Sequence, residues 1–207
     1  MMIRLLVLLT AFLLSSVQVA LAASADDAKA FANTIGDRVL VIIQDESLDN
    51  DAKLTKLEAM FTDVVDVKWV GRFVLGRHWR SLDESQQDAY QAAYRNFLIK
   101  HYVSNFVGYS GETFTIPQAR EEREGEYFVR MEIQRPKGQQ PVIVDYLLRS
   151  DGGDFKVFDI IVEGVSLINT QRSEFGSVVE RKGIEALITK LKAKSDNLQA
   201  EMEQAEG

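Results

Sequence analysis

The spacing of hydrophobic residues divides this chain into three parts. Between Phe31 and Phe106 the apolar positions recur every three or four residues, and between Phe114 and Val162 many of them recur every second residue. After Ser166 the longer spacing returns. A period near 3.6 places apolar side chains on one side of a helix, whereas a period of two places them on one side of a strand. The pattern therefore predicts helices, then a sheet, then helices.

Four helices are predicted before the sheet. The first begins near Asp26 or Asp27, the third follows Asp66 and ends at Gly76, and the fourth begins with a capping box of Ser81 and Glu84 and ends near Gly108 and Gly111. Their apolar stripes are Phe31, Ile35, Val39 and Ile42 in the first, Leu54, Leu57, Phe61 and Val64 in the second, and Tyr90, Ala93, Tyr94, Phe97 and His101 in the fourth.

Four strands are predicted in the middle of the chain. Phe114 and Ile116 mark the first, and the others are 127–134, 141–149 and 155–162. Short turns at 124–125, 136–138 and 151–153 separate them, so we expect an antiparallel meander. In the last strand apolar residues alternate on both faces, which indicates a strand covered on both sides. We assign Phe155, Val157 and Ile161 to one face, and Phe158, Ile160 and Val162 to the other.

Two helices are predicted to close the fold. One runs from Ser166 to Arg181, and Gly183 separates it from a second with the stripe Ile184, Leu187, Ile188 and Leu191. The residues 195–207 are polar and are expected to form a frayed tail. We predict an α+β fold in which N- and C-terminal helices cover a four-stranded, mainly antiparallel twisted sheet, forming one domain over 23–194.

The first 22 residues have the features of a secretory signal peptide. Arg4 precedes an apolar run from Leu5 to Leu14, and small residues follow at 20–22. We expect cleavage after Ala22, or alternatively after Ala25. A membrane anchor is the alternative, but it needs about 20 apolar residues. The sequence contains no cysteine, so lipid attachment at the cleavage site is excluded. We therefore expect an exported, soluble protein.

The charge of the chain argues against nucleic acid as a partner. The 207 residues include 24 Lys and Arg and 31 Asp and Glu, a formal net charge of -7, which becomes -8 when removal of 1–22 takes away Arg4. Nucleic-acid affinity comes mainly from neutralising phosphates, and anionic membranes attract basic segments. The absence of cysteine also excludes disulfides, thiolate nucleophiles and sulfur metal sites.

No catalytic or metal-binding motif is found in the sequence. It contains two histidines, no H-E-x-x-H motif, and at 164–168 a Gly-Val-Ser-Leu-Ile stretch in which Ile168 stands where a nucleophile elbow needs glycine. We therefore predict no catalytic residue, no metal and no cofactor. One enzymatic alternative stays open, in which Asp159 and Glu163 act as an acid and base on a lipid.

Five short segments together resemble a known family. They are VLGRHW at 74–79, YSGET at 109–113, VEGVSL at 162–167, RSEF at 172–175 and RKGI at 181–184. In this order they resemble the periplasmic lipid-binding component (MlaC) of the Mla, or maintenance of lipid asymmetry, system, a family also labelled toluene-tolerance or Tgt2/Ttg2 proteins. The resemblance covers about 31–194.

The resemblance implies a periplasmic carrier whose cargo is a phospholipid. Such a carrier would hold the acyl tails in an apolar cavity and move between an outer-membrane lipoprotein–porin complex and an inner-membrane ABC transporter with an MCE-domain protein. We expect a monomer and no enzymatic activity. Two alternatives stay open, a carrier of hopanoid-type lipids and an adaptor that bridges the two membrane complexes without carrying a lipid.

The expected lipid-binding residues come from the aromatic helix, the third and fourth predicted strands and the loops beside them. Arg77 and Arg80 could contact a phosphate. The residues expected to line the cavity are Val74, Leu75, Trp79, Tyr94, Phe97, Leu98, Tyr102, Phe106, Tyr109, Val144, Tyr146, Leu148, Phe158, Ile160, Val165 and Leu167.

Overall fold

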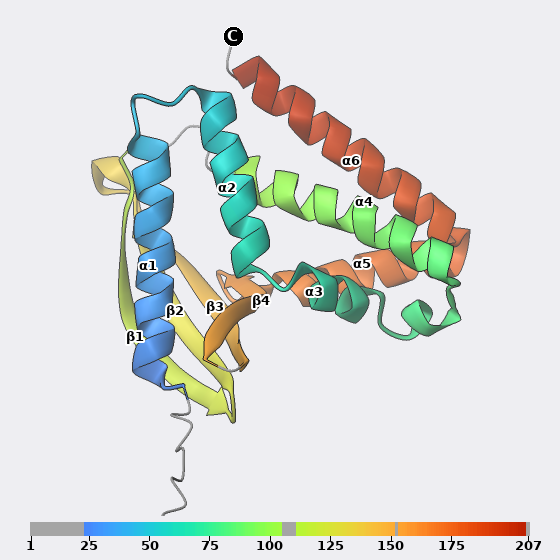
Figure 1. Ribbon diagram of the computed structural model, residues 1–207, viewed down its shortest axis with the longest axis horizontal. Coiled ribbons are helices and arrows are strands. Elements are labelled where there is room, and N and C mark those ends of the chain that lie inside the picture. Colours follow the sequence, from blue (N-terminus) through green and yellow to red (C-terminus); the bar gives the residue numbers. More distant parts are fainter. Residues whose placement is uncertain (1–22, 105–110, 152, 206–207) are drawn as a thin grey trace, which may run out of the picture.

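The computed structural model describes residues 23–104, 111–151 and 153–205, which form six α-helices and a five-stranded antiparallel sheet. Figure 1 shows α1 lying along the sheet, α2 beside it, and α3 to α6 grouped beyond β4. The predicted α+β fold, with helices before and after the sheet, is confirmed. None of the described helices has the length and hydropathy needed to cross a bilayer.

The N-terminal helices begin at side-chain caps. They are α1 (Ala25–Gln44), α2 (Asn50–Val64), α3 (Val67–Leu75) and α4 (Glu84–Val103), with the 3-10 helix η1 (Gly76–Ser81) between the last two. Asp66 caps α3, and Gly76 ends it with φ of 55°, both as predicted. Helix α1 starts slightly earlier than predicted, because Ser24 is the cap and Asp27 completes its capping box.

The predicted capping box of α4 is wrong. Asp83 is the cap, and the side chain of Gln86 accepts from the Asp83 backbone amide in return. Ser81 is the last residue of η1, and its hydroxyl donates to the carbonyl of His78 at 2.8 Å. Gly108 lies outside the described residues, while Gly111 precedes β1.

The sheet is a meander, as predicted, with one further short strand. The strands β1 (Thr113–Arg123), β2 (Glu126–Gln134), β3 (Val142–Asp151), β4 (Asp154–Val162) and β5 (Val165–Ser166) pair in sequence order. A short 3-10 turn, η3 (Pro136–Gly138), connects β2 and β3. The fifth strand arises because the chain reverses after β4, so that Val165 pairs with Val162 and Ser166 with Ile161.

A β-bulge in β4 was not predicted. Leu147 pairs with Asp159 and Leu148 pairs with Val157, so Phe158 is an extra residue between the two pairs. A bulge of this kind reverses the alternation of side chains beyond it. The face assignment made from strict alternation is therefore correct before Phe158 and wrong after it.

The bulge changes which residues of β4 share a face. Ile160 follows Phe155 and Val157 onto the face that packs against α1 and α2, in place of Ile161. Asp159 and Ile161 lie on the opposite face. An acid in an apolar strand is thus directed away from the side of the sheet that α1 covers.

The C-terminal helices are α5 (Leu167–Lys182) and α6 (Ile184–Ala205), with Gly183 between them at φ of 81°. The expected frayed tail after Lys194 is corrected, because α6 continues through it with Ser195 and Met202 buried. Helix α6 runs beside α4, as Figure 1 shows, so residues 195–205 belong to the packed fold.

Two apolar clusters form the interior. The helical cluster comprises Val67, Val70, Val74, Leu75, Tyr90, Ala93, Tyr94, Phe97, Leu98, Ile168, Phe175, Ile184, Leu187, Ile188 and Leu191. The sheet cluster comprises Ala28, Ala32, Leu57, Met60, Val64, Ile99, Val103, Ile116, Tyr127, Val129, Met131, Leu148, Phe155 and Val157. Phe61 and Val65, at the end of α2, pack against both. The clusters therefore adjoin where α2 passes the edge of the sheet.

Candidate functional site

Eight of the sixteen predicted lipid-binding residues belong to the helical cluster or pack against it. Those in the cluster are Val74, Leu75, Tyr94, Phe97 and Leu98, and those packed against it are Trp79, Tyr102 and Phe158. Tyr90, Tyr94 and Phe97 of the stripe on α4 are thus buried among α3, α5 and α6, whereas His101, which was predicted to lie on the same inner side, is exposed. Contact of these residues with a lipid stays a prediction.

Four more of the predicted residues lie on the sheet. Leu148 is in the sheet cluster, and Tyr146 and Ile160 pack against it. Val144 is buried on β3 and pairs with Met131 of β2. The strand positions therefore form one apolar face, while those on α4 mostly face the other cluster. Phe106 and Tyr109 lie outside the described residues.

The last two predicted residues flank the turn between β4 and α5. Val165 is 55% exposed, and Leu167 is partly buried. Glu163 in this turn has φ of 49°, a strained value for a residue with a side chain. Its carboxylate accepts from the Ile143 amide at 2.9 Å, and its own amide donates to the Ile143 carbonyl at 3.1 Å. These two bonds hold the turn and present the Val165 side chain to solvent.

Two tyrosine hydroxyls within the apolar interior have very different partners. Tyr94 donates to the side-chain oxygen of Gln171 at 2.7 Å, whereas Tyr146 donates to the Met131 sulfur at 3.9 Å. A thioether is a weak acceptor. Burial raises the pKa of Tyr146 to about 12, and burial is also the main reason that the pKa of Tyr94 lies well above its usual value. Both phenols therefore stay neutral donors.

Asp159 fixes the start of α5. It is 3% exposed, and its carboxylate accepts from the Ser166 hydroxyl at 2.7 Å and from the amides of Ile160 at 2.8 Å and Ile168 at 3.3 Å. Burial raises the pKa of Asp159, and these hydrogen bonds oppose the rise. Ser166 in turn caps α5 by accepting from the Asn169 amide. The acid thus joins β4 to the helix that follows.

The candidate catalytic groups have structural partners. Ser166 caps a helix and donates to Asp159, and Glu163 accepts from a backbone amide of β3. The carboxylates of Asp159 and Glu163 each make their own backbone contacts. Within 23–104, 111–151 and 153–205, no cluster of three or more His, Asp or Glu side chains is arranged to hold a metal ion.

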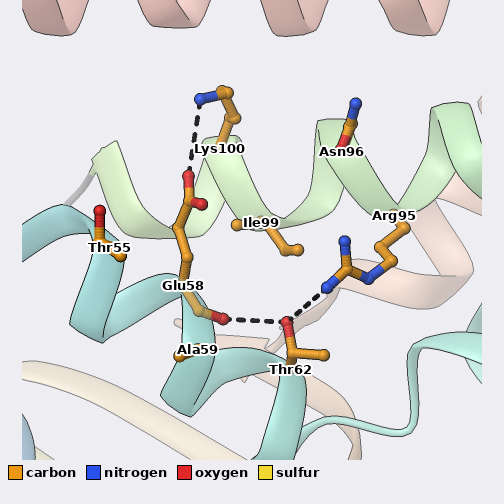
Figure 2. Close-up of a pocket in the computed structure, with 8 residues that line it drawn as sticks. All are labelled: Thr55, Glu58, Ala59, Thr62, Arg95, Asn96, Ile99 and Lys100. Carbon is orange, nitrogen blue, oxygen red and sulfur yellow. Dashed lines mark hydrogen bonds and ion pairs between the residues drawn. The ribbon is translucent and has the colours of Figure 1, made fainter.

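A polar groove of about 450 Å³ lies between α2 and α4 (Figure 2). Lys100 approaches the Glu58 carboxylate at 3.5 Å across the groove, and Arg95 donates to the Thr62 hydroxyl at 3.2 Å. Thr55, Ala59, Asn96 and Ile99 complete its lining. Charged walls do not suit hydrocarbon tails. The polar contacts across this groove therefore connect α2 to α4, and the groove is not a continuation of the apolar interior.

A second groove, of about 470 Å³, lies between α5 and the end of α3 with η1. Its lining combines Val74 and Leu75 with small and polar residues, Gly76, Arg77, His78, Asn169, Arg172, Ser173, Gly176, Ser177 and Glu180. Sequence reasoning proposed Arg77 but missed Arg172 and its neighbours. The available signal was the spacing of 169, 172, 173, 176, 177 and 180, which places small and polar residues on one side of a helix.

The chain matches one protein family over most of its length. The family described as "MlaC protein" matches residues 33–193. A curated relative from Haemophilus influenzae, named "Intermembrane phospholipid transport system binding protein MlaC", is 23% identical over 130 residues, 61% of each chain. The "Toluene tolerance protein ttg2D" of Pseudomonas putida is 26% identical over 128 residues. That alignment covers 61% of this chain and 59% of the relative.

A solved structure has a similar fold. It is a phospholipid-binding protein from Ralstonia solanacearum in complex with a phospholipid, and it superposes with a TM-score of 0.71 at 25% identity. The match covers 86% of this chain and 99% of that one. The two curated relatives are matched over only about three fifths of their length, whereas this structure is matched almost completely.

Proposed function

Because this chain belongs to the MlaC family, a family of phospholipid-binding transport proteins, we propose that it carries a phospholipid by its acyl tails across the periplasm. It would exchange the lipid between an outer-membrane lipoprotein–porin complex and an inner-membrane ABC transporter complex, and so maintain outer-membrane lipid asymmetry. The signal peptide proposed for 1–22 would deliver it there. The observation that carries this proposal is the similarity to a structure that contains a phospholipid.

The energetics favour a carrier with an apolar interior. Two acyl chains have about 30 methylenes, and each gains about 0.8 kcal/mol on leaving water. The sum is on the order of 20 kcal/mol, so a free phospholipid crosses water very slowly. A bilayer shelters the tails almost equally well, and the carrier needs only to match the membrane complexes. Small differences in docking can then set the direction of transfer.

We propose that the tails enter where the two apolar clusters adjoin. The predicted residues reach this region from both sides, with Tyr102 and Phe158 at the helical cluster and Tyr146 and Ile160 at the sheet cluster. Phe61 stacks on Tyr102 with ring centroids 5.5 Å apart, and it packs against both clusters. Separation of these clusters by a rotation of side chains would open an apolar space without breaking strand pairs.

The proposal is tested by identifying what the purified protein contains. The mature chain is purified from a bacterial periplasm, extracted with organic solvent and analysed by mass spectrometry. We expect phospholipid at about one molecule per protein, with several headgroups, because the tails supply most of the binding energy. Hopanoid in place of phospholipid would favour the hopanoid-carrier alternative.

The controls separate the remaining alternatives. A maltose-binding protein purified in parallel measures lipid that adheres nonspecifically. A folded chain with no lipid above that level would contradict the carrier and favour the adaptor. Turnover of a labelled phospholipid that is lost in a folded Asp159→Asn variant would favour the enzymatic alternative. We expect no turnover in either protein.

A further inference from the structure

The groove between α5 and η1 contains an arginine that is held in place without an acidic partner. Within the described ranges, Arg172 makes no ion pair. Its guanidinium donates to the Phe73 carbonyl at 3.3 Å and stacks over the Phe73 ring at 4.8 Å. A guanidinium has five N–H donors, so most of its donor capacity remains for another group.

The backbone beside Arg172 is shaped to admit the guanidinium. A Cβ atom on Gly76 would come within 3.0 Å of an Arg172 nitrogen, and Gly76 also has φ of 55°, which glycine adopts without penalty. The end of α3 thus leaves room for this side chain. The position of Arg172 is therefore determined from two sides, by Phe73 and by Gly76.

Among the described residues that line this groove, Glu180 is the only acid, and it is already paired. It forms an ion pair with Arg77 and lies 4.0 Å from the Nε2 atom of His78. Arg77 is therefore engaged with Glu180, whereas the charge of Arg172 is not compensated within the groove. The interior of the groove is basic although the chain as a whole carries a net charge of -7.

Helix α5 supplies further hydrogen-bond donors to the groove and a glycine, Gly176, that leaves space in it. Asn169, Ser173 and Ser177 line the groove together with Gly176. A Cβ on Gly176 would meet nothing within 4 Å, so no neighbouring atom requires glycine at this position. Glycine inside a helix is less stable than alanine. Its presence is explained if the groove must stay open for a ligand.

We propose that this groove binds a phosphate group, with Arg172 as its main charged contact. A planar guanidinium matches the geometry of phosphate oxygens, and serine and asparagine side chains add neutral donors. The phosphate could be the phosphodiester of a lipid headgroup or free phosphate. The headgroup source rests on the proposed carrier function, whereas the free-phosphate source does not.

The test is a titration of the mature chain, prepared with and without lipid, in phosphate-free chloride buffer. The probes are inorganic phosphate and glycerophosphoethanolamine, a phosphodiester without tails, and the readout is the 1H–15N spectrum. On the lipid-free chain we expect saturable shifts at Gly76, His78 and Ser173. Arg172→Gln should weaken binding by about tenfold or more, because a charge-assisted contact is lost.

Two further variants make the result specific. Arg38→Gln is the matched control, because it removes the same charge from an exposed residue of α1 that is not among the residues lining the groove, and it should bind as the unchanged chain does. Gly176→Leu should block binding by filling the groove while leaving α5 intact. Equal weakening by Arg172→Gln and Arg38→Gln, or no saturable shift with either probe, would overturn the inference.

The source of the phosphate is found with the lipid-loaded chain. If the headgroup occupies the groove, the 31P resonance of the bound lipid moves in Arg172→Gln. If free phosphate is the ligand, inorganic phosphate still shifts the groove in the loaded chain and the lipid resonance is unchanged. Lipid in the extract with an unresponsive groove would overturn only this inference. An empty extract with a responsive groove would overturn only the carrier proposal.

Discussion

The contribution of a buried tyrosine hydroxyl to stability depends on its hydrogen-bond acceptor, and Tyr94 and Tyr146 have very different acceptors. Sequence reasoning correctly placed Tyr90 and Tyr94 on the inner side of the fourth helix, because helical spacing fixes which side chains share a face. It could not find that Tyr94 bonds Gln171, since the two are 77 residues apart and meet only after α5 folds back onto α4. The helical spacing around Arg172 could have indicated a polar side of α5, but its contact with the Phe73 carbonyl joins residues 99 positions apart and could not be predicted.

Removing these hydroxyls should affect stability unequally. Tyr94→Phe deletes a 2.7 Å bond to an amide oxygen and leaves Gln171 without that donor, so we expect the free energy of unfolding to fall by about 1 kcal/mol or more. Tyr146→Phe deletes a 3.9 Å contact to a thioether and should change it by less than about 0.5 kcal/mol. Urea unfolding of both variants measures the difference.

Each variant serves as the control for the other, because both lose one oxygen from a ring in the apolar interior. Circular dichroism before unfolding should be identical for the two proteins. Equal losses of stability, or a larger loss in Tyr146→Phe, would contradict the importance that we assign to the acceptor.

At the scale of elements, several helix ends and the order in which the strands pair could be predicted from the sequence, whereas the register between β3 and β4 could not. Asp66, Gly76, Ser166 and Gly183 act as local signals within a few residues of the ends that they define. The bulge at Phe158 depends on how β3 and β4 pair, which no local pattern reveals. The end of α6 was missed because 195–205 is mostly polar. Its buried Ser195 and Met202 become apparent only when α6 is placed beside α4.

The junction between β4 and α5 should give the stability a specific pH dependence. Burial raises the pKa of Asp159 in the folded protein above its value in the unfolded chain, about 3.9. Between these two values the folded state binds more protons than the unfolded state. The contribution of Asp159 to the free energy of unfolding is therefore full below pH of about 4 and falls as pH rises through the folded pKa.

Comparison with Asp159→Asn isolates this effect, because the two proteins share every other titrating group. We expect the advantage of the unchanged chain over the variant to be largest at acid pH and to shrink as the pH is raised toward neutrality. Urea unfolding at a series of pH values measures it. An advantage that grows with pH would show that the three hydrogen bonds to the carboxylate outweigh its burial.

At the scale of the whole molecule, the interior consists of two apolar clusters that meet along one side of α2. Figure 1 shows α2 between α1 with the sheet and the group formed by α3 to α6. Each cluster could be predicted in part, since the stripes of the helices and the alternation of the strands name most of its members. The interior divides into two because the chain crosses the edge of β4 after α2, where Val65 forms an isolated β-bridge with Val157. Phe61 and Val65 lie at the boundary between the clusters.

Two exposed valines allow the proposed position of the lipid to be tested in the folded protein. Val41 on α1 is 69% exposed, and Val165 in the turn before α5 is 55% exposed. Because both face solvent, Val41→Glu and Val165→Glu should each change the free energy of unfolding by less than about 0.5 kcal/mol. Only Val165 belongs to the predicted lipid-binding residues. A carboxylate there would have to enter hydrocarbon or repel it, which costs several kcal/mol.

We therefore expect Val165→Glu to reduce co-purified lipid by about tenfold, and Val41→Glu to leave it unchanged. The measurement is phospholipid per protein in solvent extracts, with circular dichroism confirming that both variants are folded. The rigid turn strengthens the test, because the bonds of Glu163 to Ile143 limit how far a new side chain can move away. Equal lipid content in the two variants would remove the turn before α5 from the lipid site and direct the search to the aromatic face of α4.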